Sequence, residues 1–166
     1  MKLWIIRHAK SSWAEPRQAD FARPLNKRGN ADGARMASWL ASQAEPATWI
    51  WSSDAVRALA TAEFVARGFA HAAPQVVADH RLYHPSVESV CEVLRETPSD
   101  QSSVAVVAHN PALTYLVNHL AHEHALDNLP TFGVAQFTVA GKAWADFGPA
   151  ITTLESLSTP KSLPSL

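Results

Sequence analysis

The stretch SVAVVAHNP, residues 103–111, begins as an apolar run and ends abruptly in polar residues. Short apolar runs without polar alternation are typical of strands that are buried on both faces of a sheet. Asn is a favoured N-cap and Pro is favoured at the first helical position, so Asn110 and Pro111 predict a helix over residues 111–120. The stretch therefore predicts a buried strand over residues 103–108 that places His109 at its junction with a helix.

The same alternation of strand and helix runs through the rest of the chain. Strands are predicted over residues 2–6, 48–51 and 75–78, and helices from Asn26 to near Pro46, over 55–65 and over 87–94. The N-cap candidates are Ser52, Ser53 and Asp54 for the second helix and Ser86 for the third. Residues 134–139, 143–147 and 151–157 are predicted to be extended, and residues 159–166 to form a flexible tail.

Strands that alternate with helices predict an α/β fold, a three-layer sandwich with a mostly parallel central sheet flanked by helices. The 166 residues fit one domain, which we predict over residues 1–158. Ligands of such sheets bind beyond the carboxyl ends of the strands. Three predicted strand ends carry Arg7-His8, Ser52 with nearby Arg57, and His109. We therefore expect these side chains to meet in one site.

The composition excludes several classes of protein. The chain has 14 Lys and Arg against 15 Asp and Glu, so no overall basic field favours nucleic acid or an anionic membrane. No apolar run approaches the roughly 20 residues that a membrane-spanning helix needs. The single Cys91 can form no internal disulfide, and the start of the chain lacks the pattern of a secretory signal. We predict a cytoplasmic protein whose partner is neither a nucleic acid nor a membrane.

The Arg7-His8 pair suits phosphoryl transfer. Imidazole is a competent covalent nucleophile, and guanidinium binds phosphate oxygens in bidentate fashion. Taken alone, however, the pair is better explained by a hydrogen-bonded histidine at a strand end and an arginine in a surface ion pair. The motifs described next instead favour a role in phosphoryl transfer for Arg7 and His8.

Four blocks of sequence between residues 2 and 120 carry a family resemblance. They are RHAKSSW (7–13), DFARPLNKRG (20–29), SSDAVRALATA (52–62) and VVAHNP (106–111). Together, in this order, they resemble the signatures of the histidine phosphatase superfamily (phosphoglycerate mutase-like) in its SixA-type form, the phosphohistidine phosphatases. Ala108 stands where the family has glycine, and Asp54 and Ala55 depart slightly from the third block. Neither Ala55 nor Ala108 holds a family position that donates a side chain to phosphate, so the departures leave the expected chemistry intact.

The resemblance implies a phosphoglycerate mutase-like fold and a metal-independent phosphatase without a cofactor. The first histidine of the signature is the family nucleophile, so His8 is expected to take the phosphoryl group. Arg7 and Arg57 are expected to bind the phosphate oxygens and to keep His8 neutral, because like charge disfavours protonation. His109 is expected to donate a further hydrogen bond to phosphate. The expected partner is a phosphorylated protein, such as a histidine phosphotransfer domain, or a small phosphoester.

The acid that protonates the leaving group has no clear counterpart in the sequence. Many members of the superfamily carry a Glu for this purpose, whereas Glu63 and Glu88 here are better interpreted as solvated helix carboxylates. An imidazole leaving group can be protonated near neutral pH, but an alkoxide needs a strong acid beside it. The sequence therefore favours phosphohistidine as the substrate. Lys10 and Arg23 are also interpreted as solvated side chains at the rim of the site.

Three other functions were weighed from the residues: the first stays open, and the other two are disfavoured. A broad small-molecule phosphomonoesterase would use the same site, and a non-catalytic phosphoprotein-binding module is disfavoured because both His8 and His109 are present. The cluster His119, His122 and His124 matches no zinc-protease spacing, so a polar helix end explains it better than a metal site. Neither the natural substrate nor the oligomeric state can be deduced from the sequence.

Overall fold

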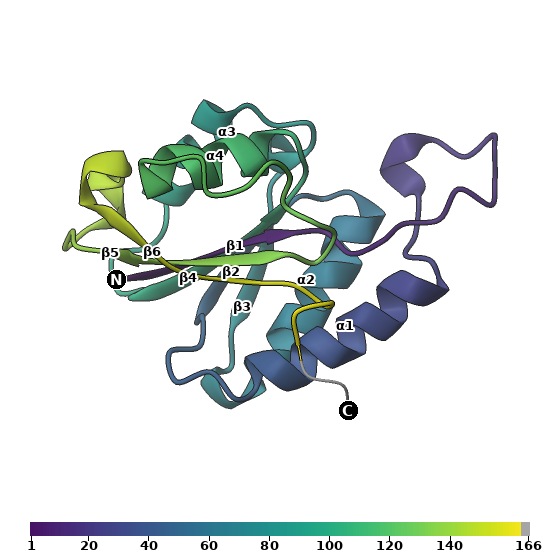
Figure 1. Cartoon of the computed structure of the whole chain (residues 1–166), viewed down its shortest axis with the longest axis horizontal. Helices are drawn as coiled ribbons and strands as arrows, with labels where there is room; N and C mark the ends of the chain where they lie inside the picture. The colour runs from purple at the N-terminus through teal and green to yellow at the C-terminus, as the bar shows by residue number, and fades with distance from the viewer. Residues whose placement is uncertain (164–166) are drawn as a thin grey trace.

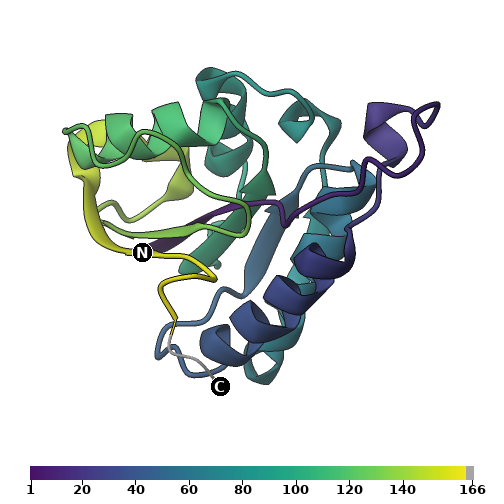
Figure 2. The ribbon, with the colours of Figure 1, turned by 45° about the vertical axis from the view of Figure 1, so that its right-hand side comes forward.

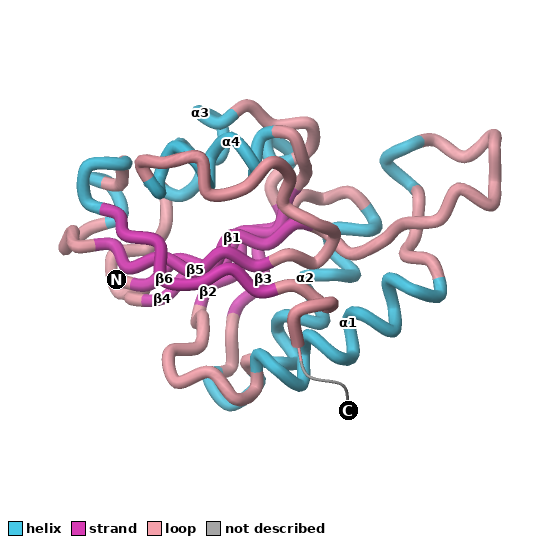
Figure 3. The backbone as a smooth tube through the Cα atoms, in the orientation of Figure 1, coloured by secondary structure: helices cyan, strands magenta, loops and turns pink. Residues whose placement is uncertain are grey.

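The computed structural model describes residues 1–163. A six-stranded sheet, in the order β3-β2-β4-β1-β5-β6, lies between two pairs of helices (Figure 1). The strands are β1 Lys2–Arg7, β2 Trp49–Ser52, β3 Gln75–Ala78, β4 Ser103–Ala108, β5 Val134–Val139 and β6 Thr152–Ser158. The α-helices are α1 Lys27–Leu40, α2 Val56–Gly68, α3 Val87–Arg95 and α4 Ala112–Ala121. The predicted α/β sandwich is confirmed, and Figure 3 shows its sheet as one layer among the helices.

Four of the six strands run in the same direction. The strands β3, β2, β4 and β1 pair in parallel, whereas β5 and β6 are antiparallel additions beside β1. In the register of the sheet, Arg7 lies opposite Ala108 and Ser52 lies opposite Val107. Three central strands therefore end at the same level, which brings the residues that follow them together.

Each face of the sheet has its own apolar core, because alternate side chains of a strand point to opposite faces. In β1, Leu3 and Ile5 pack into the core beneath α3 and α4, whereas Trp4 and Ile6 pack into the core beneath α1 and α2. Figure 2 shows the two helix pairs on opposite sides of the strands. Such two-sided burial is why β1 and β4 have no polar alternation in sequence.

The starts of the helices follow the predicted caps only in part. Asn26 caps α1, and its side chain accepts a hydrogen bond of 2.8 Å from the Gly29 N–H, but the helix ends at Leu40 rather than near Pro46. Ser86 caps α3 as predicted. The N-cap of α2 is Ala55, not one of the three predicted polar residues. Ser53 instead turns its hydroxyl toward the site, as described below.

The helix after β4 also starts one residue later than predicted. Pro111 is its N-cap, and the Asn110 side chain accepts a hydrogen bond of 3.2 Å from the Thr114 N–H. The Asn110–Pro111 peptide bond is cis.

The prediction of an extended segment over residues 143–147 is wrong. Trp144–Asp146 form a 3-10 turn, and both Trp144 and Phe147 are buried in the core beneath α3 and α4. Residues three apart lie on the same side of a 3-10 turn, so this conformation buries both aromatic rings where a strand would expose one. The Trp144 indole N–H donates to the Gln101 carbonyl at 2.7 Å.

The last described residues follow β6 in a turn. Thr159 and Ser162 are joined by hydrogen bonds, and an Arg35 guanidinium nitrogen lies 2.6 Å from the Leu163 carbonyl oxygen. Residues 164–166 of the predicted flexible tail lie outside the described residues. None of the helices within residues 1–163 has the length and apolar character to cross a membrane.

Candidate active site

His8 directly follows β1 and has one ring nitrogen committed to the backbone. Its Nδ1 lies 2.7 Å from the Ala9 carbonyl oxygen, which can only accept, so Nδ1 carries the proton and Nε2 keeps its lone pair. The side chain is 9% exposed. Burial, assisted by the charges of Arg57, Arg7 and Arg23, lowers the pKa of His8 to about 4. The ring is therefore neutral at pH 7 and presents Nε2 as a nucleophile.

The Ala9 carbonyl that holds His8 is fixed from helix α2. The Ala9 N–H donates to the Thr61 hydroxyl at 2.9 Å, and that hydroxyl donates to the Arg57 carbonyl at 2.7 Å. Thr61 is fully buried and lies one helical turn after Arg57. One hydroxyl thus links the loop after β1 to the first turn of α2.

Arg57 is the second residue of α2 and is held by Asp20 from a distant loop. Its Nη1 donates to the Asp20 backbone carbonyl at 2.6 Å, and its Nη2 to the Asp20 carboxylate at 3.0 Å. Only 4% of the arginine is exposed. The fork geometry of guanidinium fixes its plane when two of its nitrogens are held.

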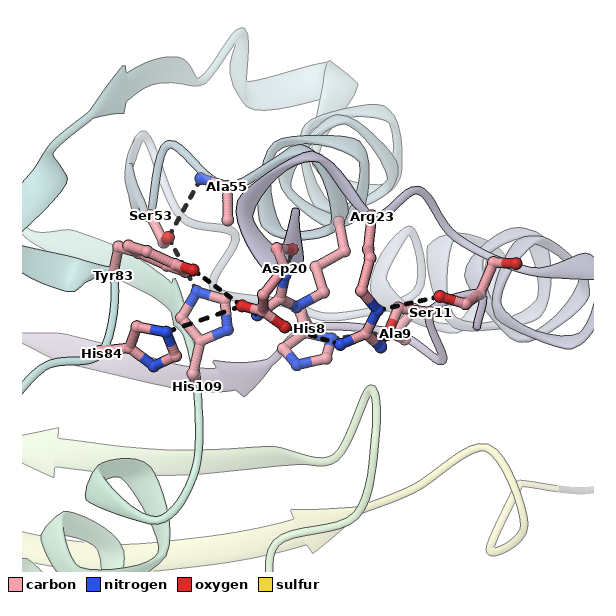
Figure 4. A network of polar contacts seen from close by, with 12 residues as sticks. His8, Ala9, Ser11, Asp20, Arg23, Ser53, Ala55, Tyr83, His84 and His109 are labelled. Carbon is pink, nitrogen blue, oxygen red and sulfur yellow. Dashed lines mark hydrogen bonds and ion pairs between the residues drawn. The ribbon is translucent and has the colours of Figure 1, made fainter. Parts of the chain in front are cut away.

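Asp20 gathers four partners around its carboxylate (Figure 4). It accepts hydrogen bonds from Arg23 at 2.7 Å and from the Tyr83 hydroxyl at 2.8 Å, and the His84 Nε2 lies 3.6 Å from the same oxygen as Tyr83. Burial alone would raise the pKa of Asp20, but the hydrogen bonds from Tyr83, Arg57 and Arg23 outweigh it and lower the pKa to about 2. Asp20 is therefore an anion throughout the physiological range.

The interpretation of Arg23 as a solvated side chain is wrong, because the residue is 7% exposed. Its Nε donates to the Ser12 carbonyl at 2.9 Å, a terminal nitrogen donates to the Ser11 hydroxyl, and the guanidinium lies 3.3 Å from the ring centre of Trp13. Stacking on an aromatic face and the ion pair with Asp20 offset the cost of burying the charge. Lys10 is exposed, as predicted.

Arg7 and His109 complete the set of predicted residues. Arg7 donates from Nη1 to the Leu129 carbonyl at 2.8 Å, while its buried Nε has no hydrogen-bond partner among residues 1–163. The His109 Nε2 lies 2.8 Å from the Ser53 hydroxyl, and its ring centre is 5.0 Å from that of His8. Burial, reinforced by His8 and Arg57, lowers the pKa of His109 to about 3. Its buried Nδ1 has no hydrogen-bond partner in the same part of the chain.

These side chains surround a cleft of about 180 Å³ at the carboxyl end of the sheet. It is lined by Arg7, His8, Lys10, Ser11, Trp13, Arg23, Arg57 and Thr131. Three of the four predicted site residues line it, and His109 packs against the ring of His8 beside it. The lining combines three buried or half-buried guanidinium groups with one neutral imidazole, an arrangement suited to a compact anion.

A larger hollow of about 490 Å³ lies at the opposite end of the sheet, beside Lys2. The Lys2 ammonium already contacts Glu45 at 2.8 Å and Glu155 at 2.7 Å, so its charge is matched there. The larger volume of this hollow therefore does not make it the better candidate for the functional site. The smaller cleft is preferred because three guanidinium groups line it and two of them share the single carboxylate of Asp20, whereas two carboxylates contact the one ammonium of Lys2.

The histidines near the end of α4 are separate from this cleft. His122 ends the helix in the left-handed conformation with φ of 59°, and His124 pairs with Asp127 at 2.7 Å. Within residues 1–163, no three His, Cys, Asp or Glu side chains are grouped so that they could hold a metal ion. His122 therefore has a local role at the end of α4, and His124 has one in the segment that follows.

Several contributors to the site were missed in sequence. Ser53, Thr61 and Asp20 lie within the resembling blocks and Tyr83 lies outside them, but no spacing rule indicated that their side chains meet. Thr61 lies four residues after Arg57, and this helical spacing was the one local signal. Asp20 and Tyr83 are 63 residues apart, so their contact depends on the folded loops.

A family model for the histidine phosphatase superfamily (branch 1) matches residues 3–84. An uncharacterised chloroplastic protein of Arabidopsis thaliana is 29% identical over 174 residues, which cover 97% of this chain and 78% of that protein.

Solved structures share the fold over nearly the whole chain. A protein of Agrobacterium tumefaciens assigned as the phosphohistidine phosphatase SixA is 25% identical, with a TM-score of 0.82 over 96% of this chain and 97% of that one. Its counterpart from Nakamurella multipartitia is 22% identical, with a TM-score of 0.83 over 96% and 95%. The protein histidine phosphatase SixA in complex with tungstate is 24% identical, with a TM-score of 0.79 over 99% and 100%.

These likenesses confirm the phosphoglycerate mutase-like fold that the four sequence blocks imply. The family match includes Arg7, His8 and Arg57, three of the residues that surround the cleft. On this combined basis, residues 3–84 match the histidine phosphatase superfamily, and the chain as a whole shares the fold of the SixA structures.

Proposed function

We propose that the protein hydrolyses the phosphoryl group of phosphohistidine in a protein, through a covalent phospho-His8 intermediate. The observation that carries the proposal is the state of the His8 ring. Its Nδ1 proton is held by the Ala9 carbonyl, its pKa is lowered to about 4, and it lines a cleft of guanidinium groups. A neutral imidazole that faces an anion site is a nucleophile prepared for phosphorus.

The covalent step uses the free lone pair of His8. Nε2 attacks phosphorus in line with the leaving group, the bond to the leaving atom breaks, and the phosphoryl group is transferred to Nε2. The proton stays on Nδ1, which donates it in a hydrogen bond to the Ala9 carbonyl, so phospho-His8 is protonated at its other nitrogen and is a good leaving group in turn. Water then attacks phosphorus, inorganic phosphate is released, and His8 returns to its neutral form.

The transition state is stabilised by fixed donors. Phosphoryl transfer spreads negative charge over three equatorial oxygens, so catalysis depends mainly on orientation and on positive groups held in place. Arg57 is fixed by Asp20, and Arg7 keeps its Nε free for a ligand. His109 has a buried Nδ1 without a partner within residues 1–163, which suits a further hydrogen bond to phosphate.

A protein phosphohistidine is favoured over a sugar phosphate by two considerations. The SixA structures have TM-scores of 0.79 to 0.83, whereas a glucosyl-3-phosphoglycerate phosphatase has 0.65. Imidazole is also an easier leaving group than an alkoxide at neutral pH. The proposed partner is therefore a phosphorylated protein, such as a histidine phosphotransfer domain. We propose that no metal takes part, because the cationic lining of the cleft would repel one.

Phosphate release tests the proposal directly. Wild type, His8→Ala and His71→Ala would be compared on a phosphohistidine protein and on p-nitrophenyl phosphate, each with and without a chelator. His71 is exposed and outside the site, so His71→Ala is the matched control. Chelator-insensitive release that His8→Ala abolishes, faster on phosphohistidine than on the ester, is expected.

Other results would point to other functions. Equal rates on the two substrates would favour a broad phosphomonoesterase, and turnover of neither would favour a phosphoprotein-binding module. Acid-labile phosphate on wild type but not on His8→Ala, trapped by rapid quenching, tests the covalent intermediate. Hydrolysis without any trapped phosphoprotein, under conditions in which dephosphorylation is slow, would argue for direct attack by water.

A further inference from the structure

The cleft has the proposed nucleophile His8 and arginines that can bind the phosphate oxygens. When the bond from phosphorus to the leaving atom breaks, that leaving atom also needs a proton. Asp20 cannot supply it, since its pKa is lowered to about 2 and it accepts three hydrogen bonds. His8 and His109 cannot either, since burial lowers their pKa values to about 4 and 3. Arginine does not release its proton in proteins. None of these groups is a suitable donor.

The two glutamates considered from sequence are engaged elsewhere. Glu88 pairs with Arg95 at 2.7 Å on the surface of α3. Glu63 lies on α2 beside a separate surface hollow that it lines with Arg67 and Val76. Neither residue lines the cleft around His8; His84 does not line it either, but its Nε2 lies 3.6 Å from Asp20, which holds two of the lining arginines.

His84 is placed at the rim by the turn that follows β3. The 3-10 turn His80–Leu82 is followed by Tyr83, and the ring of His84 packs at a tilt of 43° against that of Tyr83, with ring centres 4.1 Å apart. The backbone of His84 is left-handed, with φ of 48°, a conformation that costs a non-glycine residue energy and is often kept at functional positions. Its side chain is 67% exposed, so a substrate can reach it.

Its neighbours hold His84 beside the reacting groups. The Nε2 lies 3.6 Å from the Asp20 carboxylate, and the ring centre is 6.3 Å from that of His109, which is itself 5.0 Å from that of His8. Figure 4 shows His84 and His8 on opposite sides of His109. In-line displacement needs its nucleophile and its proton donor on opposite sides of phosphorus, and a phosphoryl group bound beside His109 would lie between these two imidazoles.

We propose that His84 is the catalytic acid of the reaction, donating the Nε2 proton to the leaving atom. This inference rests on the proposed function. As the His8 Nε2 bonds to phosphorus, the bond from phosphorus to the leaving nitrogen or oxygen breaks, and that atom takes the proton of His84. In the second step, neutral His84 accepts a proton from the attacking water, whose hydroxide bonds to phosphorus as the bond from phosphorus to the His8 Nε2 breaks and its electron pair returns to Nε2. His84 is thereby restored and inorganic phosphate leaves.

The charges around His84 suit this exchange. Asp20 from the loop before α1, Tyr83 beside it and His109 after β4 are the ionisable groups that face it within residues 1–163, with Arg57 behind Asp20. The Asp20 carboxylate lies 3.6 Å from the His84 Nε2, and the neighbouring His109 ring is neutral. Histidine is also the side chain that exchanges protons most readily near neutral pH. Asp20 therefore acts as a positioning residue for both Arg57 and His84.

The test exploits the acidity of the leaving group. Phenyl phosphate releases a weakly acidic phenol and needs a proton more than p-nitrophenyl phosphate does. His84→Gln should lower kcat on phenyl phosphate by about 10² to 10³ and on p-nitrophenyl phosphate by less than about tenfold, with little change in KM. The matched control is His80→Gln, since His80 is an exposed histidine on the same turn that pairs with Asp54 at 2.8 Å. It should change neither rate.

Rescue separates proton transfer from a structural effect. Added imidazole should restore part of the phenyl phosphate activity of His84→Ala, and His84→Glu should retain more activity than His84→Gln on this ester. Equal losses of kcat on the two esters, without rescue, would overturn the assignment in favour of a packing role, and so would unchanged rates. If wild type turns over neither the esters nor phosphohistidine, or if His8→Ala stays active, the proposed function itself fails.

Discussion

The neutral state of His8 predicts how the stability of the protein depends on pH. The His8 pKa falls from 6.5 in the unfolded chain to about 4 in the fold, chiefly because the ring is buried. Between these values the unfolded chain binds a proton that the folded chain does not, so stability rises with pH in this window. It is fully present above pH 6.5 and is lost as the pH falls toward 4.

The size of the effect follows from the pKa difference. One pKa unit corresponds to 1.36 kcal/mol, so a shift from 6.5 to about 4 is worth about 3 kcal/mol, of which roughly 2 to 3 kcal/mol are lost by pH 4.5. His109 acts in the same direction, since its pKa is lowered to about 3. The two ring centres are 5.0 Å apart, so protonation of one further opposes protonation of the other.

Urea unfolding at pH 7 and pH 4.5 measures this loss. In His8→Gln the decrease in the free energy of unfolding between the two pH values should be smaller than in wild type by about 2 kcal/mol. His71→Gln, which removes an exposed histidine, should behave as wild type does. Stability is a cleaner measure than kcat/KM here, because a phosphate substrate itself titrates near pH 6. An equal pH dependence in wild type and His8→Gln would refute a buried, neutral His8.

The contacts of Arg57, Thr61 and Asp20 lead to three further expectations. Arg57→Ala should lower kcat/KM by about 10² to 10³ in steady-state assays, because it removes a fixed donor; a loss below about tenfold would speak against its role. Thr61→Val should reduce the free energy of urea unfolding by about 1–3 kcal/mol, because the buried Ala9 N–H loses its acceptor, whereas Thr61→Ser should cost less. Asp20→Asn should make inorganic phosphate a severalfold stronger inhibitor while kcat falls, because it removes a negative charge beside Arg23 and Arg57. An unchanged inhibition constant would contradict that last expectation.

The sheet was predictable because its central strands are buried on both faces. A strand such as β4 needs apolar residues at every position, and the run from Val104 to Ala108 meets that need with no alternative interpretation. The segment over residues 143–147 failed because Trp144 and Phe147 suit a core position in either an extended chain or a 3-10 turn. Local pattern cannot decide which geometry buries both rings.

The residues of the candidate site were likewise predictable only in part. Strand ends brought Arg7, His8 and Arg57 to one cleft, as the topology predicted. Arg23 was misjudged because its burial depends on a loop that folds it between Asp20 and Trp13. His84 gave no sequence signal, since its neighbour Asp20 lies 64 positions earlier and meets it only in the folded chain. The spacing of apolar residues that predicts helices and strands does not predict contacts between loops that are distant in sequence.

The position of β1 within the sheet also has a consequence for synthesis. The strand is made early, yet its partners are β4 and β5, and Arg7 pairs with Ala108 about 100 residues later. At about 5–20 residues per second, the ribosome needs roughly 5–20 s to supply that partner. Until then the apolar segment after Lys2 lacks a sheet in which to bury itself, and His8 lacks the Ala108 carbonyl that accepts its backbone N–H. A nascent chain that ends before Ser103 should therefore need chaperones and should form no phosphoenzyme, although it already contains the whole Arg7-His8 signature.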